Sequence, residues 1–146
     1  MKHFKNYING EWILPKSDKW LENINPATGD AIGKFPLSNY DDVNAAAEAA
    51  KTAQPQWRNM PSPKRAEYIC KAVDFLKENK ERFAIDLCEE MGKTLPECRG
   101  DLQETIDMAL YCAGEGRRNF GLFTSSEFQN RMVLSYREPI GVVGAI

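Results

Sequence analysis

Cysteines and a histidine are the residues of this sequence best suited to nucleophilic or metal-binding chemistry. They are Cys70, Cys88, Cys98, Cys112 and His3. Zinc sites usually contain cysteines spaced two to four residues apart, and the sequence has no Cys-x-x-Cys pair. A cysteine nucleophile needs a base or positive charge beside it, which Cys112 lacks in the sequence around it. The residues therefore predict reduced, buried or half-buried thiols rather than a zinc site, a disulfide framework or an active centre.

Carboxylate pairs such as Glu89–Glu90 and Asp101 with Glu104 fall in sequence that we expect to be helical. Solvated charge is the ordinary meaning of such pairs, and no histidine or lysine pair marks them as an acid–base set. We interpret the pair Glu104 and Asp107 as solvated charge for the same reason. The residues taken alone thus indicate no active site.

Two glycine patterns resemble parts of nucleotide-binding motifs. The pair Gly141-x-x-Gly144 lacks the third glycine of a dinucleotide fingerprint, and no helix follows it in the sequence. Close packing within a buried strand is the reading that we favour. Gly92, followed by lysine and threonine, resembles the end of a phosphate loop, but a helix C-cap explains it better.

Composition is that of one ordinary globular domain. The chain has 146 residues, 42% hydrophobic and 27% charged, with a formal net charge of −2. The absence of a basic excess argues against nucleic-acid binding. No apolar run is long enough for a membrane span, and the N-terminal residues lack the apolar core of a secretion signal. We therefore expect a cytoplasmic protein that contacts neither nucleic acid nor membrane.

The first part of the chain predicts strands joined by turns. Asn6–Ile13 contains the dipeptide Asn-Gly, which favours a tight hairpin turn. A second pair is expected at Trp20–Ile24 and Ala31–Phe35, joined by a turn rich in proline and glycine.

Helical periodicity begins after these strands. Ser38 or Asn39 is a candidate cap for a helix ending near Pro55, and a second helix is expected to begin at Ser62. A third ends at Gly92, and the longest runs from about Pro96 to Phe120. Residues 55–63 and 122–130 are interpreted as linkers.

The C-terminal region predicts strands again. Arg131–Tyr136 alternates between two faces, as a half-exposed strand does. Ile140–Ile146 is apolar without alternation, which is typical of a parallel strand buried on both faces. Such a strand needs neighbours and a crossover, and none follows it in the sequence. The fold class is therefore α/β, with N-terminal β-hairpins, amphipathic helices and the first strand of an incomplete parallel sheet.

Several segments in order resemble the aldehyde dehydrogenase superfamily, specifically its N-terminal segment. They are Tyr7–Trp12, Asn25–Gly29, Asp41–Ala50, Trp57–Arg65, Glu90–Lys93, Tyr111–Gly114 and Glu138–Gly144. The resemblance spans essentially the whole chain. Residues 1–146 would then be the N-terminal part of the Rossmann-like cofactor-binding domain, with an oligomerisation strand near 131–137 and the catalytic domain absent.

The family resemblance implies NAD- or NADP-dependent oxidation of an aldehyde to a carboxylic acid. In that family a cysteine attacks the aldehyde, oxyanion donors stabilise the adduct, and a glutamate activates water. None of the residues with these roles matches a position here, so no catalytic residue is assigned. The segment Arg99–Phe120 resembles most the members that act on semialdehydes of small carboxylic acids. A chain that contains no catalytic residue is expected to be inactive alone.

Lesser roles carry over by position. Asn23 and Ile24, with Glu90, match residues that bind a structural monovalent cation in several members; a turn and a helix end without an ion fit equally well. Gly100, Glu104 and Met108 match a helix face that lines the substrate entrance in relatives. The alternative is a face that only packs against other residues or meets solvent. Ile146 matches a residue at the edge of the nicotinamide pocket.

Assembly is a further implication of the family resemblance. Arg131–Tyr136 resembles the strand that completes a neighbouring subunit, so a homo-oligomer is expected, although an ordinary edge strand would alternate in the same way. The alternative function is a non-catalytic truncated paralogue that acts as an oligomerisation or interaction module. An unrelated α/β binding domain is disfavoured by the order of the matching segments.

Overall fold

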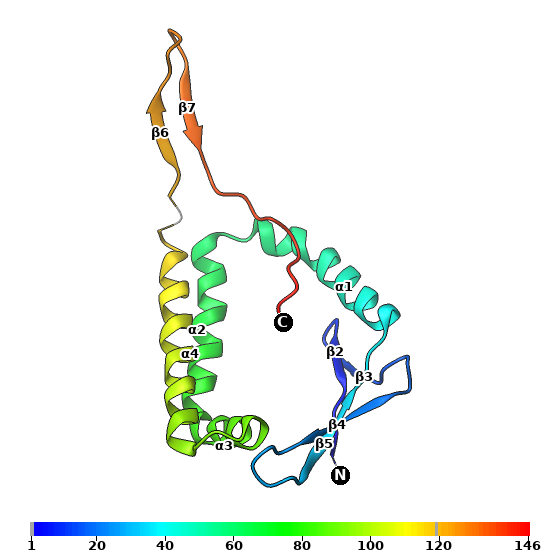
Figure 1. Cartoon of the computed structure of the whole chain (residues 1–146). Coiled ribbons are helices and arrows are strands. Elements are labelled where there is room, and N and C mark those ends of the chain that lie inside the picture. Colours follow the sequence, from blue (N-terminus) through cyan, green and yellow to red (C-terminus); the bar gives the residue numbers. More distant parts are fainter. Residues whose placement is uncertain (1, 119) are drawn as a thin grey trace.

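The computed structural model describes residues 2–118 and 120–146, and in them small β-sheets precede a group of helices and a long hairpin (Figure 1). The N-terminal strands are β1 Lys2–His3, β2 Asn6–Ile8, β3 Glu11–Ile13, β4 Trp20–Ile24 and β5 Ala31–Pro36. The helices are α1 Tyr40–Asn59, α2 Ser62–Glu78, α3 Lys80–Met91 and α4 Leu95–Glu115. The hairpin consists of β6 Leu122–Ser125 and β7 Met132–Ser135. The expected mixed α/β class is confirmed.

Both N-terminal hairpins form where the sequence predicts them. Strands β2 and β3 pair antiparallel around Asn9 and Gly10, whose φ angles are 53° and 83°. Positive φ at both central residues is what a type I′ turn requires. Strands β4 and β5 also pair antiparallel, and β1 adds to β5 in parallel. The register of β4 and β5 shifts between Asn23, which pairs with Gly33, and Ile24, which pairs with Ala31, so the extra residue of the bulge is Ile32 of β5.

Helix α1 begins at the expected cap and continues beyond the expected end. The Asn39 side chain accepts a hydrogen bond from the Asp42 N–H at 3.2 Å, and Asp42 accepts one in return from the Asn39 N–H. The prediction that the helix ends near Pro55 is wrong, because α1 reaches Asn59. A proline removes only one helical hydrogen bond, and the Arg65 guanidinium donates to the carbonyl oxygens of Arg58 and Met60 at that end.

Helices α2 and α4 lie side by side, with α3 across one end of the pair (Figure 1). Val73 of α2 and Ile106 of α4 are almost fully buried between them. At the other contact, Ala84 of α3 packs with Cys98 and Leu102 of α4. These residues form the small core that sets the positions of the three helices.

The ends of α3 and α4 test two further expectations. Gly92 caps α3 with a left-handed φ of 69°, as predicted. Helix α4 ends at Glu115, so the prediction that it extends to Phe120 is wrong. At that end Arg118 returns to Glu115 through a side-chain hydrogen bond of 3.0 Å and a backbone hydrogen bond, which closes the helix in a turn. Asn119, within the expected helix, lies outside the described residues.

The hairpin of β6 and β7 projects away from the helices (Figure 1). The strand expected at Arg131–Tyr136 is confirmed as β7, but the interpretation of residues 122–130 as a linker is wrong for its first part, which forms β6. Phe123 pairs with Leu134, and Thr124 pairs with Val133. Phe123 and Thr124 are of types enriched in strands, and main-chain pairing with β7 completes the strand.

The expected strand at Ile140–Ile146 does not form. Residues 140–146 have no regular secondary structure and are exposed, and no strand of the described residues pairs with them. A parallel strand depends on neighbouring strands for its hydrogen bonds. Residues 142–144 instead lie along α1, where they and an alanine-rich face of that helix line an apolar hollow of about 770 Å³.

The chain is extended and exposes much apolar surface. Its accessible surface is 11578 Å², whereas a compact monomer of this mass exposes about 7600 Å². Exposed large side chains occur on α1, on α4 and on both strands of the β6–β7 hairpin. Over the described ranges, no helix is both long and apolar enough to cross a membrane.

Candidate functional site

The exposed face of α4 carries the residues expected at a substrate entrance. Gly100, Glu104 and Met108 all line one hollow of about 550 Å³, together with Gln103, Asp107 and Tyr111. Helical spacing of four residues places the three expected positions on one side of the helix. The structure therefore brings together the residues that the sequence grouped.

A second hollow of about 560 Å³ continues along the same helix and shares Glu104 and Met108 with the first. All the lining residues of both hollows belong to α4, so each hollow has one wall and is open on its other side. Met108 is 56% exposed. Ligand sites usually enclose most of their ligand, so this face can contribute one wall of a site but cannot enclose a substrate by itself.

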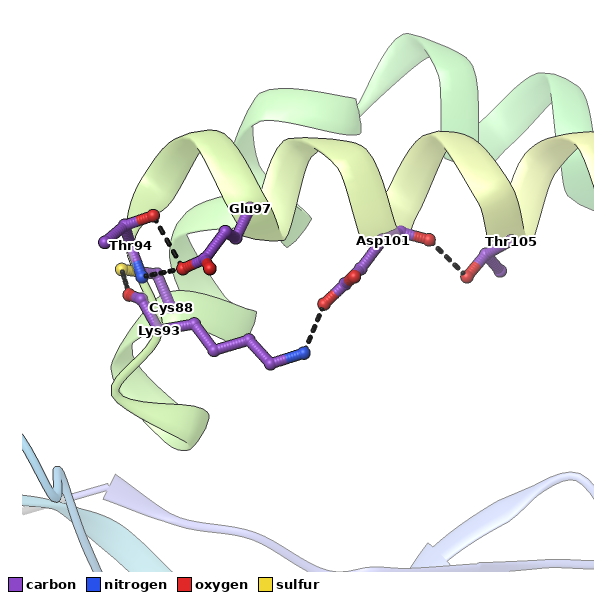
Figure 2. A network of polar contacts seen from close by, with 6 residues as sticks. All are labelled: Cys88, Lys93, Thr94, Glu97, Asp101 and Thr105. Carbon is purple, nitrogen blue, oxygen red and sulfur yellow. Dashed lines mark hydrogen bonds and ion pairs between the residues drawn. The ribbon is translucent and has the colours of Figure 1, made fainter.

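Ion pairs and hydrogen bonds hold the first half of α4 in place. The Glu97 carboxylate accepts hydrogen bonds from the Thr94 hydroxyl at 2.7 Å and the Thr94 N–H at 3.1 Å (Figure 2). These two bonds hold the pKa of Glu97 below its usual value. Lys93 pairs with Asp101 at 2.7 Å, and that hydrogen bond raises the pKa of Lys93. The hollows thus lie on a helix whose beginning is fixed to the preceding turn.

Helix α3 also contacts the first half of α4. Glu81 of α3 accepts a hydrogen bond of 2.9 Å from Arg99 Nε and a second bond from the same guanidinium. The hydrogen bond to Arg99 lowers the pKa of Glu81 and raises that of Arg99. Lys80 donates to the Gln103 side chain at 2.6 Å. Gln103 in turn donates to Asp107, so the polar residues of the hollow are connected to α3.

The three residues expected at a cation site lie where the β4–β5 turn meets the end of α3. Asn23 and Ile24 lie opposite the bulge of β5, where the ladder is locally interrupted. The Asn23 side-chain nitrogen is buried without a hydrogen-bond partner. Glu90 is exposed in the last turn of α3, and a Cβ at Gly92 would lie 2.7 Å from Pro26, so helix and turn are in contact.

Backbone carbonyls released at a bulge and the negative end of a helix dipole both favour a cation. Oxygen ligands of this kind suit hard ions. Within residues 2–118 and 120–146, no group of three or more histidine, cysteine, aspartate or glutamate side chains is placed to hold a metal ion. Ligands at this position would therefore come mainly from the backbone.

The cofactor position expected at Ile146 lies at the end of the irregular segment and is fully exposed. In the described part of the chain, Gly141 and Gly144 do not lead from a strand into a helix. A dinucleotide phosphate needs backbone N–H groups at such a helix start. The described residues therefore do not fit a complete NAD or NADP site, and we assign them no step of hydride transfer.

The thiols divide into two kinds. All four cysteines are free, with Cys98 buried and Cys88 half-buried as expected. The expectation is wrong for Cys70 and Cys112, which are exposed because the helix faces that carry them are only partly covered. Sequence reasoning also missed that Cys88 packs against the cluster that contains Cys98. The only local signal was their position on either side of the Gly92 cap.

Comparison with known proteins covers nearly all of the chain. The model of the aldehyde dehydrogenase family matches residues 12–146. The alpha-ketoglutaric semialdehyde dehydrogenase of Bacillus subtilis is 36% identical over 98% of this chain. A malonate-semialdehyde dehydrogenase of Listeria innocua is 36% identical over 100% of it. In both cases the chain spans 30% of the relative's length.

Solved structures give the same result. The succinate-semialdehyde dehydrogenase of Burkholderia pseudomallei matches 96% of this chain and 29% of its own, with 31% identity and a TM-score of 0.90. Other similar structures in the family are complexes with NAD and with NADP. The order of hairpins, helices and projecting hairpin is thus the arrangement found in these enzymes. The chain belongs to the aldehyde dehydrogenase family.

Proposed function

We propose that the chain is a segment of an NAD- or NADP-dependent aldehyde dehydrogenase that oxidises an aldehyde to a carboxylic acid. The observation that carries this proposal is the family match over residues 12–146. Since the chain spans 30% of the curated relatives, catalytic residues would be supplied outside it. The large exposed apolar surface supports this reading, because further protein would cover it.

Semialdehydes of small carboxylic acids are the proposed substrate class. The support is the naming of similar proteins as malonate- and alpha-ketoglutaric semialdehyde dehydrogenases. Gly100, Glu104 and Met108 are proposed to form one wall of the entrance, because they share a hollow on α4. Ile146 is proposed to lie at the edge of the nicotinamide pocket once residues 140–146 are paired as a strand.

Two supporting roles complete the proposal. Asn23, Ile24 and Glu90 would bind a structural monovalent cation opposite the bulge of β5. The β6–β7 hairpin would pair with a neighbouring subunit of a homo-oligomer. Its Phe123, Met132 and Leu134 support this role, because strand pairing places them on one face and each is exposed.

The substrate proposal is tested with the protein that carries this chain. It is incubated with NAD or NADP and a panel containing malonate, alpha-ketoglutaric and succinate semialdehydes beside neutral aldehydes of similar length. We expect reduction of the cofactor, with higher kcat/KM for the semialdehydes. Equal kcat/KM for neutral aldehydes would contradict the substrate class, and no cofactor reduction with any aldehyde would contradict the enzyme proposal.

An alternative is a non-catalytic module that acts by assembly. The exposed β6–β7 hairpin is the observation that favours it. The same assay separates the two functions, because an assembly module would oligomerise without reducing NAD or NADP.

A further inference from the structure

Cys88 and Cys98 lie on either side of the turn that joins α3 to α4. Cys88 is in the last turn of α3, where its carbonyl oxygen accepts a hydrogen bond of 2.9 Å from the Gly92 N–H. Cys98 is in the first turn of α4, and its N–H donates to the Thr94 carbonyl oxygen at 3.1 Å. The left-handed Gly92 thus reverses the chain and returns the start of α4 to the end of α3.

The two thiols differ in burial but share one apolar cluster. Cys98 has no exposed surface and forms the cluster with Ala84 and Leu102, and Cys88 packs against it. Cys88 is half-buried, and its Sγ donates to the Lys93 carbonyl oxygen at 3.0 Å (Figure 2). A small oxidant can therefore approach Cys88, while Cys98 is enclosed.

Burial also affects the ionisation of Cys98. Burial raises the pKa of the Cys98 thiol. Since Cys98 is buried and Cys88 is only half-buried, Cys88 is the thiol that a small oxidant reaches first.

We propose that Cys88 and Cys98 form a reversible disulfide when the protein meets a hydroperoxide. The Cys88 thiolate attacks one oxygen of hydrogen peroxide, the O–O bond breaks, and a Cys88 sulfenic acid and hydroxide form. The Cys98 thiolate then attacks the Cys88 sulfur, and the S–O bond breaks with loss of a second hydroxide. The two thiol protons convert both hydroxides to water, and two electrons pass from the sulfurs to the peroxide oxygens.

The disulfide would change the junction of α3 and α4. It replaces the hydrogen bond from Cys88 to the Lys93 carbonyl oxygen with a covalent link from the last turn of α3 to the first turn of α4. The linked corner carries Glu90 and contacts the β4–β5 turn through Gly92 and Pro26. Oxidation would thus make this corner more rigid, independently of the proposed catalytic activity.

Mass spectrometry of the oxidised protein tests the proposal directly. Trypsin cleaves after Arg82, Lys93 and Arg99, so Cys88 lies on the peptide Phe83–Lys93 and Cys98 on Thr94–Arg99. Cys70 and Cys112 lie on two other tryptic peptides. The native protein that carries this chain is treated with hydrogen peroxide, free thiols are alkylated, and the digest is searched for linked peptides.

We expect the linked pair Phe83–Lys93 and Thr94–Arg99 to be the main disulfide, to disappear on treatment with dithiothreitol, and to raise the Tm by about 5 °C. The variant with both C70S and C112S should retain it, and C88S should lose it. When the protein is unfolded in urea before oxidation, the four cysteines should form disulfides without this preference for Cys88 and Cys98. A linked pair no more frequent in native protein than in urea would overturn the proposal, as would Cys98 remaining reduced while Cys88 is oxidised to sulfinic acid. Both of these outcomes are measured on the wild-type protein, so they do not depend on the folding of a variant.

Discussion

The carboxylate of Asp42 accepts a hydrogen bond of 2.9 Å from the Lys16 N–H, which joins the start of α1 to the loop after the first hairpin. The same carboxylate accepts a hydrogen bond of 3.0 Å from the Asn39 N–H and thereby also closes the helix cap. Asp42 is only 2% exposed. One buried side chain therefore connects the β-region with the helical region.

These contacts predict a pH-dependent stability. The hydrogen bonds from Lys16 and Asn39 lower the pKa of Asp42. A carboxyl group with a depressed folded-state pKa stabilises the fold above its unfolded pKa of about 4, and that contribution is lost as pH falls through the folded pKa. Urea unfolding of D42N should show lower stability than wild type at pH 7 and a smaller decline below pH 4. D41N, at the neighbouring exposed position, is the control, and an equal effect of both variants would contradict this role.

Gly92 and Gly100 should respond in opposite ways to alanine. Gly92 has a φ of 69°, and an added Cβ would lie 2.7 Å from Pro26, so G92A should cost about 2 kcal/mol or more. A Cβ at Gly100 meets nothing within 4 Å, so G100A should stabilise α4 by about 0.5–1 kcal/mol. Urea unfolding of the two variants measures both effects. Destabilisation by G100A would show that this face of α4 is covered by something outside the described residues.

The proposed cation site should make stability depend on the salt. We expect potassium chloride to raise the Tm by about 2–4 °C above tetramethylammonium chloride at equal ionic strength, because only the small ion fits carbonyl oxygens. E90Q should remove this difference. E89Q, which changes the adjacent exposed carboxylate, is the matched control. Equal Tm values of the wild-type protein in the two salts would contradict the site.

The β6–β7 hairpin should govern assembly through one of its two faces. Leu134 pairs with Phe123, whereas Thr124 pairs with Val133 on the opposite face. L134K should weaken association, because it places a charge on the apolar face, and T124K should leave it nearly unchanged. Light scattering across a dilution series measures the mass of each variant. An unchanged mass for L134K would show that the hairpin does not hold the subunits together.

Local chemistry explains which elements the sequence predicts well. The turn at Asn9–Gly10, the cap at Asn39 and the left-handed Gly92 each depend on residue types within a few positions of one another. The family resemblance added the grouping on α4, where Gly100, Glu104 and Met108 share one hollow.

Elements that depend on distant partners were predicted poorly. Strand β6 forms because Leu122–Ser125 pairs with β7, and nothing in its own composition requires this. The apolar segment Ile140–Ile146 has the composition of a buried strand but pairs with no strand among the described residues. The contact between Cys88 and the cluster of Cys98 follows from how α4 folds back on α3, which periodicity alone does not reveal.

The central claim is that this chain belongs to an aldehyde dehydrogenase whose catalytic residues lie outside residues 1–146. The most direct measurement compares these residues expressed alone with the protein that carries them, each incubated with NAD or NADP and the aldehyde panel. The account predicts cofactor reduction by the protein that carries the chain and none by residues 1–146 alone, because the catalytic residues of the family match no position in them. Robust formation of NADH or NADPH by residues 1–146 alone would contradict it.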